Sequence, residues 1–268
     1  MNISWLLQGV EYMTIRMFKA EIYRLKFSKP FYVMFSIGLV AILFQTYSIL
    51  DRFYIYVGLE DGELTQIFGY NAFLSMGIDG FMMFFIPFIV VSIFSSEYSK
   101  NTYKNLITKA KEKGYVFLGK YTAFIGVIFM MNFIFAILST SLCSVVNGWG
   151  DTFNILHILN ILFLVIKYTL YFVSVASLII ILSFIIRSEA LIVILFFVTN
   201  IIESLIASFL PMLNNRFFIL ISKLFPTSYS NAFFNSNNAE TLHAWFSICL
   251  TLLISVMISI SVFQKKEI

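Results

Sequence analysis

Residues 121–146 read YTAFIGVIFMMNFIFAILSTSLCSVV, and none of these 26 side chains carries a charge. An α-helix rises about 1.5 Å per residue, so a helix over this run is about 39 Å long. About 20 apolar residues are enough to cross the hydrocarbon core of a bilayer. The run therefore predicts a transmembrane helix.

The remainder of the chain has the same apolar character. Of its 268 residues, 60% are hydrophobic, only 12% are charged, and 32 are Phe. A soluble domain of this size cannot hide so much apolar surface in one core. The composition therefore excludes a soluble enzyme, a disordered chain and a nucleic-acid-binding domain, and it predicts an all-α polytopic membrane protein.

Six apolar runs predict six transmembrane helices that form one membrane domain over residues 31–263. The runs cover residues 31–50, 73–94, 121–146, 167–187, 190–210 and 242–263. With both termini inside, most of the 18 basic residues fall on the inner side and more than half of the 14 acidic residues on the outer side. This bias follows the positive-inside rule. We therefore expect a multi-pass protein of the plasma membrane, with a cytoplasmic N-terminal segment (1–30) and a cytoplasmic tail (264–268).

The fourth run has an ambiguous start, because residues 154–186 are nearly all apolar and too long for one straight crossing. In one interpretation Lys167 snorkels at the outer interface, and residues 152–166 form a separate interfacial or re-entrant helix. In the other interpretation, one long tilted helix buries Lys167. The sequence leaves both open.

The segment 13–29, MTIRMFKAEIYRLKFSK, predicts an amphipathic helix at the inner membrane surface. Its basic residues would face anionic headgroups, and a simple basic flank that sets the topology is the alternative. The expected apolar face consists of Met13, Met17, Phe18, Ala20, Ile22, Tyr23 or Arg24, and Leu25. Translation from Met13 instead of Met1 is a further alternative, which detection of a Trp5-containing peptide in the native protein by mass spectrometry would exclude.

Residues 211–240, PMLNNRFFILISKLFPTSYSNAFFNSNNAE, join the fifth and sixth spans. The segment is too apolar for a free loop and too short for two full crossings. We expect a hairpin that re-enters the outer leaflet and ends near Pro226, since Pro terminates helices.

The longest inner loop joins the second and third spans over residues 95–120. From residue 97 it reads EYSKNTYKNLITKAKEKGYVFLGK, with six lysines and two acids. Residues 97–109 predict a short helix with Tyr103, Leu106 and Ile107 on one side. Because this helix starts where the second span ends, motion of one would move the other.

An acid, a Thr five residues later and two aliphatic residues nine and ten residues later form a motif in this loop. The residues are Glu97, Thr102, Leu106 and Ile107. With this motif the chain resembles the membrane subunits of type-2 ABC exporters. That family usually has Gly where Asn101 stands, but Asn also tolerates a left-handed backbone, so the departure is mild. A Pro that often follows in the family is absent, whereas Gly119-Lys120 matches a pair that the family has before the third span.

The resemblance implies a non-catalytic transport subunit that works with a separate ATPase chain. Two such permeases, identical or homologous, would combine with two ATPase subunits, and those partners would bind the ATP. The resemblance is greatest to permeases for bacteriocins, lantibiotics or other antimicrobial peptides, including immunity systems. The resemblance therefore implies an ATP-driven exporter of an amphipathic substrate, embedded in the lipid bilayer of a bacterial plasma membrane. The residues expected to couple the ATPase to the spans are Glu97, Thr102, Tyr103, Lys104, Leu106 and Ile107.

Other chemistry is hard to find in the sequence. Residues 114–120, GYVFLGK, match a phosphate-binding loop, but Tyr121 stands where Ser or Thr should ligate magnesium. Both histidines lack partners at metal-ligand spacing, so we expect no metal and no cofactor in this chain. Cys143 and Cys249 lie in apolar runs, either as packing residues or as a disulfide pair, and the sequence leaves their pairing open.

Two residues inside predicted spans are candidates for the transport pathway. Glu203 is a carboxylate deep in the fifth span, where ionisable residues usually face the bundle interior. It lines a pathway, or it balances Lys167 or polar neighbours such as Asn200 and Thr199. Pro87 would kink the second span and free a backbone carbonyl.

A secondary transporter or a membrane scaffold without ATP coupling is the alternative function. A secondary transporter should show internal repeats, broken helices and several intramembrane ionisable residues. The sequence shows no repeat and few such residues, which favours the ATP-driven exporter.

Overall fold

The computed structural model describes residues 3–50, 68–75, 78–95, 113–150, 152–186, 188–213, 215–222, 225 and 238–265. The elements in these ranges are all helical, which confirms the predicted all-α class. Two of them are short variants, a π-helix (η1) and a 3-10 helix (η2). The elements are α1 (Ile3–Lys26), α2 (Lys29–Leu50), α3 (Ala72–Ser75), α4 (Ile78–Val90), η1 (Val91–Ser95), α7 (Lys113–Asn147), α8 (Ile155–Ser183), α9 (Glu189–Phe209), η2 (Leu210–Leu213), α10 (Arg216–Ser222) and α12 (Asn238–Lys265).

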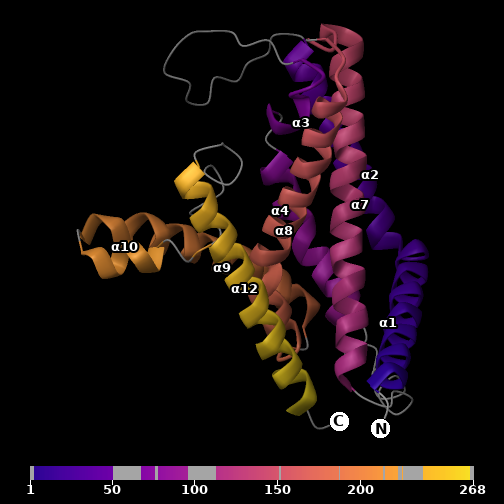
Figure 1. The fold of residues 1–268 in the computed structure, drawn as a ribbon, viewed down its shortest axis with the longest axis vertical. Helices are drawn as coiled ribbons and strands as arrows, with labels where there is room; N and C mark the ends of the chain where they lie inside the picture. Colours follow the sequence, from indigo (N-terminus) through magenta and orange to yellow (C-terminus); the bar gives the residue numbers. More distant parts are fainter. Residues whose placement is uncertain are drawn as a thin grey trace.

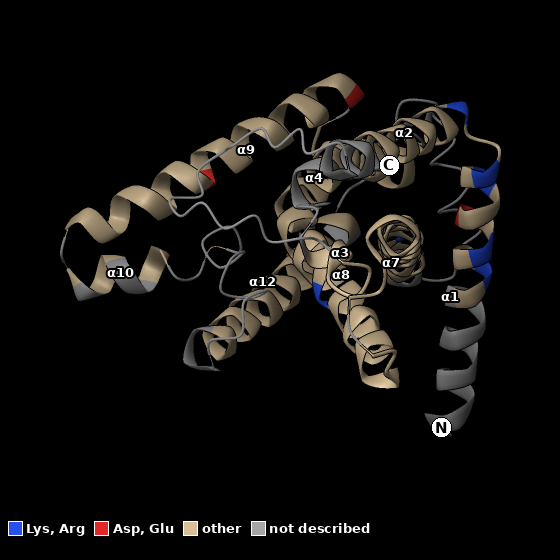
Figure 2. Ribbon diagram, turned by 90° about the horizontal axis from the view of Figure 1, so that it is seen from above, with Lys and Arg blue, Asp and Glu red and all other residues tan. Residues whose placement is uncertain are grey.

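The central helix of the bundle is α7. Figure 2 looks along its axis and shows α1, α2, α3, α4 and α8 around it, and α12 also packs on it. Two glycines let neighbours approach closely. A Cβ on Gly126 of α7 would lie 3.1 Å from the ring of Phe18 in α1, and a Cβ on Gly38 of α2 would lie 3.0 Å from the ring of Phe135 in α7. The start of α1, the start of α7 and the end of α12 lie at the same end of the bundle (Figure 1).

Among the described residues, four helices are long and apolar enough to cross a membrane. They are Val116–Asn147, Ile155–Ser183, Glu189–Leu213 and Thr241–Phe263, which cover the predicted third to sixth spans. In the region of the first two predicted spans, the structure has α2 and the continuous pair of α4 and η1, which include the shorter apolar helices Phe31–Ala41 and Met82–Ser95. The structure therefore confirms a helical chain with four helices of spanning length, and the count of six stays a prediction.

The ambiguous fourth run forms one continuous helix, α8, so the interpretation with a separate helix at 152–166 is wrong. Residues 155–183 contain neither Gly nor Pro, and Asn154 caps the helix start by accepting a hydrogen bond from the Leu156 N–H at 3.1 Å. Lys167 has a high helix propensity and does not break the helix. Its ammonium lies over the ring of Phe163, 5.1 Å from the centroid. A cation–π contact of this kind lets a lysine stay within an apolar helix.

Helix α9 differs from the other long helices in its direction and its burial. Figure 2 shows α9 along its length while α7 is seen end-on, so α9 runs across the bundle axis. Only 11% of the most apolar stretch of α9 is buried, whereas 61% of the corresponding stretch of α8 is buried. The predicted fifth span is thus a helix of spanning length, but it does not lie parallel to α7.

The segment after α9 turns back beside it. α9 continues into η2, and α10 then packs against both (Figure 1). Residues 223–224 and 226–237, which include Pro226, lie outside the described residues. The re-entrant hairpin at 211–240 therefore stays a prediction.

The N-terminal helix α1 packs on α7 and runs largely across the bundle axis (Figure 2). The single apolar face expected from the sequence is wrong, because the apolar residues divide between two sides. Leu25 is buried and Met17 packs against the core, whereas Ile22 and Tyr23 are exposed. Near a membrane an apolar side chain can face lipid as well as protein, so periodicity alone does not separate these two groups.

Candidate functional site

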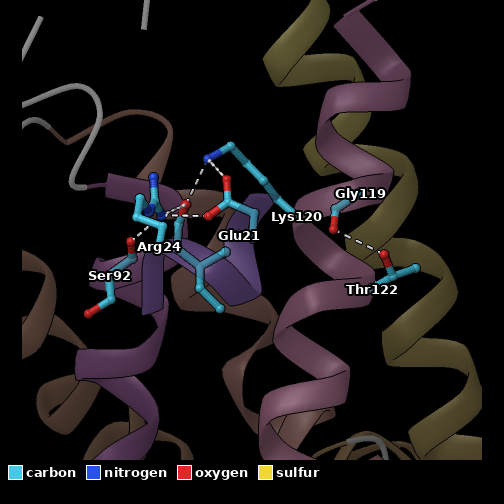
Figure 3. Close-up of polar contacts among 7 residues, drawn as sticks. Glu21, Arg24, Ser92, Gly119, Lys120 and Thr122 are labelled. Carbon is cyan, nitrogen blue, oxygen red and sulfur yellow. Dashed lines mark hydrogen bonds and ion pairs between the residues drawn. The ribbon is translucent and has the colours of Figure 1, made fainter. Parts of the chain in front are cut away.

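Two oppositely charged side chains are almost completely buried where α1 meets α7. Glu21 of α1 is 3% exposed and Lys120 of α7 is 1% exposed. Their Oε1 and Nζ atoms are 2.9 Å apart (Figure 3). Removing a charge from water is expensive unless it is paired, so each of these residues depends on the other for its burial.

Arg24 joins the pair from the next turn of α1. Its guanidinium lies 2.7 Å from Glu21 Oε2, and it also donates hydrogen bonds to the carbonyls of Ser92 and Ile93 (Figure 3). Within the described residues Glu21 Oε2 accepts no aligned hydrogen bond, so its contact with Arg24 is an ion pair defined by distance. Glu21 therefore joins two cations that come from two different helices.

The same cations cap the end of the α4–η1 helix. Lys120 Nζ donates to the Ile93 carbonyl at 2.8 Å, beside the Arg24 contact with the same oxygen. The last carbonyls of a helix lack partners within the helix and carry a partial negative charge, so cations stabilise them. We call Glu21, Arg24, Lys120 and the Ser92 and Ile93 carbonyls the inner ion cluster.

The charges of the inner ion cluster largely offset one another. Its two cations exceed its one carboxylate by a single positive charge. The C-terminal end of a helix offsets roughly half a charge of that sign. Since Lys120 and Glu21 are excluded from water, this balance is what makes the arrangement tolerable at low dielectric.

Four buried phenylalanines pack together from η1, α7, α8 and α12, and two of them are close to the cluster in the sequence, since Phe94 follows Ile93 and Phe117 precedes Lys120 by three residues. Phe94 of η1, Phe117 of α7, Phe184 at the end of α8 and Phe263 of α12 are each at most 1% exposed. Their rings contact one another at centroid distances of 5.2 to 6.4 Å. The cluster and these rings together connect α1, η1, α7, α8 and α12.

The inner ion cluster lies at both ends of the predicted coupling segment. η1 ends at Ser95 and α7 starts at Lys113, so Ile93 and Lys120 flank residues 96–112 on either side. The predicted coupling residues within that segment lie outside the described residues. They are Glu97, Thr102, Tyr103, Lys104, Leu106 and Ile107.

The apparent phosphate-binding loop at 114–120 is helical. These residues belong to the first turns of α7, and the Lys120 ammonium binds Glu21 and the Ile93 carbonyl. The Gly119 carbonyl accepts a hydrogen bond from Thr122 Oγ1 at 3.0 Å, as in a helix (Figure 3). This agrees with the sequence argument against nucleotide binding at this position.

Pro87 and the π-helix are neighbours in α4–η1. Pro87 is buried inside α4, one turn before η1 begins at Val91. Pro cannot donate its backbone nitrogen to the preceding turn, and π-helical turns accommodate such local disruptions. Ser92 and Ile93, whose carbonyls accept from the two cations, lie within this π-helix.

A groove of about 590 Å³ lies between α4, α8 and α9. Asn200, Ser204 and Ser208 follow one face of α9 at steps of four residues and give the groove a polar side. Its other lining residues are apolar or aromatic and are Met83, Tyr171, Phe196, Phe197, Ile201 and Leu205. Glu203 is partly buried on α9, next in sequence to Ser204.

The sequence analysis missed Glu21. It gave Lys120 as an inner positive charge within the Gly119-Lys120 pair and Arg24 as an inner positive charge or a member of the apolar face, and it assigned a partner to neither. The signal for Glu21 was present, since it is the one acid within the basic segment 13–29. The two cysteines are separate free thiols, with Cys143 buried in α7 and Cys249 exposed on α12. They therefore do not form the disulfide that the sequence left open.

An all-α chain with several apolar helices of spanning length is a multi-pass membrane protein. Residues 17–203 match the family model described as ABC-2 family transporter protein. The match covers more than two thirds of the chain and includes every residue of the inner ion cluster, so the chain belongs to the ABC-2 transporter family. Membership makes it a transport membrane subunit, generally non-catalytic, and implies an ABC ATPase partner. No curated protein sequence matches it.

Proposed function

We propose that this chain is the transmembrane subunit of an ATP-driven exporter for an amphipathic substrate, with membrane-active peptides as the first candidates. Bacteriocins, lantibiotics and other antimicrobial peptides belong to this class, including the peptides that self-immunity systems remove from the producing cell. Two permease subunits, identical or homologous, assemble with two ATPase subunits that bind and hydrolyse the ATP. Both termini, the coupling loop 95–120 and the ATPases lie on the cytoplasmic side.

The observation that carries ATP coupling is the contact between Lys120 and the Ile93 carbonyl. This contact holds η1 and the first turns of α7 together, and these are the described elements that precede and follow residues 96–112 in the sequence. A push on that segment by an ATPase therefore acts on two membrane helices at once. Residues 97–109 form the helix that docks on the ATPase, with Tyr103, Leu106 and Ile107 as anchors and Glu97 and Lys104 as orienting charges.

The groove between α4, α8 and α9 supports an amphipathic substrate. Its polar side, with Asn200, Ser204 and Ser208, faces aromatic and aliphatic side chains from three helices. A ligand with one polar and one apolar side would satisfy both surfaces, as small-molecule sites generally require. Glu203, beside this polar side, and Pro87 in α4 belong to the proposed pathway.

The test of the proposed function is purification of the tagged chain from its native membranes under mild conditions. We expect an ABC ATPase to co-purify, and we expect the complex in vesicles to hydrolyse ATP faster when its substrate is present. A chain that purifies without an ATPase and moves a solute down an ion gradient would be a secondary transporter. A chain that does neither would be a scaffold.

For Glu203, we expect the change to Gln to reduce transport while leaving expression and assembly intact. The change removes a negative charge that a pathway at this depth would use, and Glu203→Asp should retain part of the transport. Transport in vesicles and the yield of folded chain are the two measurements. If Glu203 only balances Lys167, Glu203→Gln and Lys167→Gln should each lower the yield and the double variant should restore it. Unchanged transport and yield in all three variants would remove both roles.

A further inference from the structure

A pocket of about 220 Å³ lies between α7, α8 and α12. Apart from one tyrosine, its walls consist of aliphatic side chains and a methionine. They include Tyr121 and Ile125 of α7, Leu170 and Val173 of α8, and Leu253 and Met257 of α12. This pocket shares no lining residue with the groove between α4, α8 and α9 that is proposed for the substrate.

The hydroxyl groups beside the pocket are not offered to a ligand. The Tyr121 hydroxyl is buried. The Ser255 hydroxyl, which lies close to it, donates to the Leu252 carbonyl of its own helix at 2.9 Å. A molecule in this pocket therefore gains contact area and no hydrogen bonds. That chemistry selects a plain hydrocarbon, because a polar group there would lose its hydrogen bonds to water without replacement.

The mouth of the pocket opens on the exposed side of α12. Leu253 and Met257, which are one turn apart, line the pocket and are 65% and 70% exposed. Both lie within Thr241–Phe263, a helix long and apolar enough to cross a membrane, so bilayer chains surround the mouth. Water does not compete for such a place, since an apolar cavity of about 150 Å³ stays dry and takes up benzene.

The depth of the pocket corresponds to one leaflet of the bilayer. The start of α7 and the ends of α8 and α12 meet at one end of the bundle, where Phe117, Phe184 and Phe263 contact one another. Counted from these three helix ends, the lining residues lie about 12 to 20 Å along each helix. Each helix is about 42 Å long or longer, so the pocket lies in the half nearer the inner ion cluster. A lipid chain of that leaflet reaches about 15 Å, half of the hydrocarbon core.

We propose that this pocket binds one acyl chain of a phospholipid from the leaflet on the side of the inner ion cluster. The chain enters between Leu253 and Met257 and packs against Tyr121, Ile125 and Val173. It completes the packing of α12, whose most apolar stretch is only 28% buried within the chain, whereas that of α7 is 50% buried. The site requires neither the ATPase nor the cargo, so its test is independent of the proposed function.

The site is tested on the full chain in nanodiscs that contain a phospholipid with a photoactivatable diazirine in the middle of one acyl chain. After illumination, mass spectrometry of peptides should find several-fold more label at Leu253 and Met257 than at Leu178. Leu178 is the comparison because it is 49% exposed in the same half of α8 and does not line the pocket. Phosphatidylcholine and phosphatidylglycerol probes should label alike, since the pocket carries no charge.

Two variants that fill the pocket with a ring complete the test. Val256→Phe fills it from α12 and Leu170→Phe from α8, and both residues are partly buried lining residues. Each variant should lower the label at Leu253 and Met257 several-fold and leave the label at Leu178 unchanged. Leu178→Phe adds the same ring outside the pocket and should keep the wild-type pattern. If one filling variant does not fold, the other decides.

Three results would overturn the proposal. Equal labelling of the pocket and of Leu178 in the wild-type chain would show only the lipid that surrounds every membrane protein. Unchanged labelling of the pocket in a folded filling variant would place the chain elsewhere. Labelling by the phosphatidylglycerol probe alone would show that a headgroup, and not the acyl chain, determines binding.

Discussion

Replacing Lys120 with Met should lower the stability of the folded chain, because it removes one of the two cations that pair with Glu21. Met has a similar length and volume, so the substitution leaves no large cavity. It does remove the ammonium that pairs with Glu21 and that donates to the Ile93 carbonyl. Loss of one partner from a buried ion pair costs about 3–5 kcal/mol when the other charge stays buried without compensation. Because Arg24 still lies 2.7 Å from Glu21, we expect a loss at or below the lower end of that range. Thermal unfolding of the purified chain, followed by scanning fluorimetry, measures the loss.

The matched controls for this substitution are a change at a neighbouring residue of α7 and a double variant that also changes Glu21. Thr122 lies two residues later on the exposed side of α7, and Thr122→Val should change the unfolding temperature little. Lys120→Met combined with Glu21→Gln should recover much of the loss, since it removes the unpaired charge as well. A Lys120→Met chain that unfolds at the wild-type temperature would show that the pair contributes nothing to stability.

The sequence predicts the helices well because the signal for each one is local. Residues 121–146 need no information from elsewhere to form a helix, since an apolar run in lipid must satisfy its backbone hydrogen bonds internally. The same reasoning placed helices over 167–187, 190–210 and 242–263. The structure has a helix in each of these ranges, although α8 starts earlier than predicted and ends at Ser183. The direction of a helix is not local. Periodicity indicates that α9 is apolar and helical but says nothing about its crossing of the bundle axis.

The inner ion cluster could not be predicted for a related reason. Glu21 and Lys120 are far apart in the sequence, and their pairing depends on how α1 docks onto α7. In a basic segment near a membrane, the positive-inside rule already accounts for every Lys and Arg as a topology signal. The rule therefore does not distinguish the Lys and Arg residues that also form buried ion pairs. Lys120 and Lys26 look equivalent in the sequence, yet Lys120 is 1% exposed and Lys26 is fully on the outside of α1.

Replacing both Tyr103 and Leu106 with Ala should uncouple the transporter. These residues lie in the predicted docking helix at 97–109, which resembles the coupling motif of the family. Loss of two apolar anchors from a docking helix should weaken ATPase binding by about 2 kcal/mol or more, since a few buried anchors carry most of the binding energy at such contacts. The chain should still insert, because both changes lie outside every predicted span. ATPase co-purification, substrate-stimulated ATP hydrolysis and export should all decrease.

The matched control removes charge from the same loop and keeps the anchors. If the loop acts only as a positive flank that sets topology, Lys109→Gln with Lys111→Gln should disturb insertion, and the Tyr103 and Leu106 double variant should behave as wild type. If the loop docks on the ATPase, the Tyr103 and Leu106 double variant should lose ATPase binding and export, whereas Lys109→Gln with Lys111→Gln should insert and behave as wild type. The inner ion cluster sharpens this comparison, because Lys120 and Ile93 hold both ends of segment 96–112 whichever residues within it are changed. Normal ATPase binding and normal export by the Tyr103→Ala, Leu106→Ala chain would refute the assignment of the docking helix.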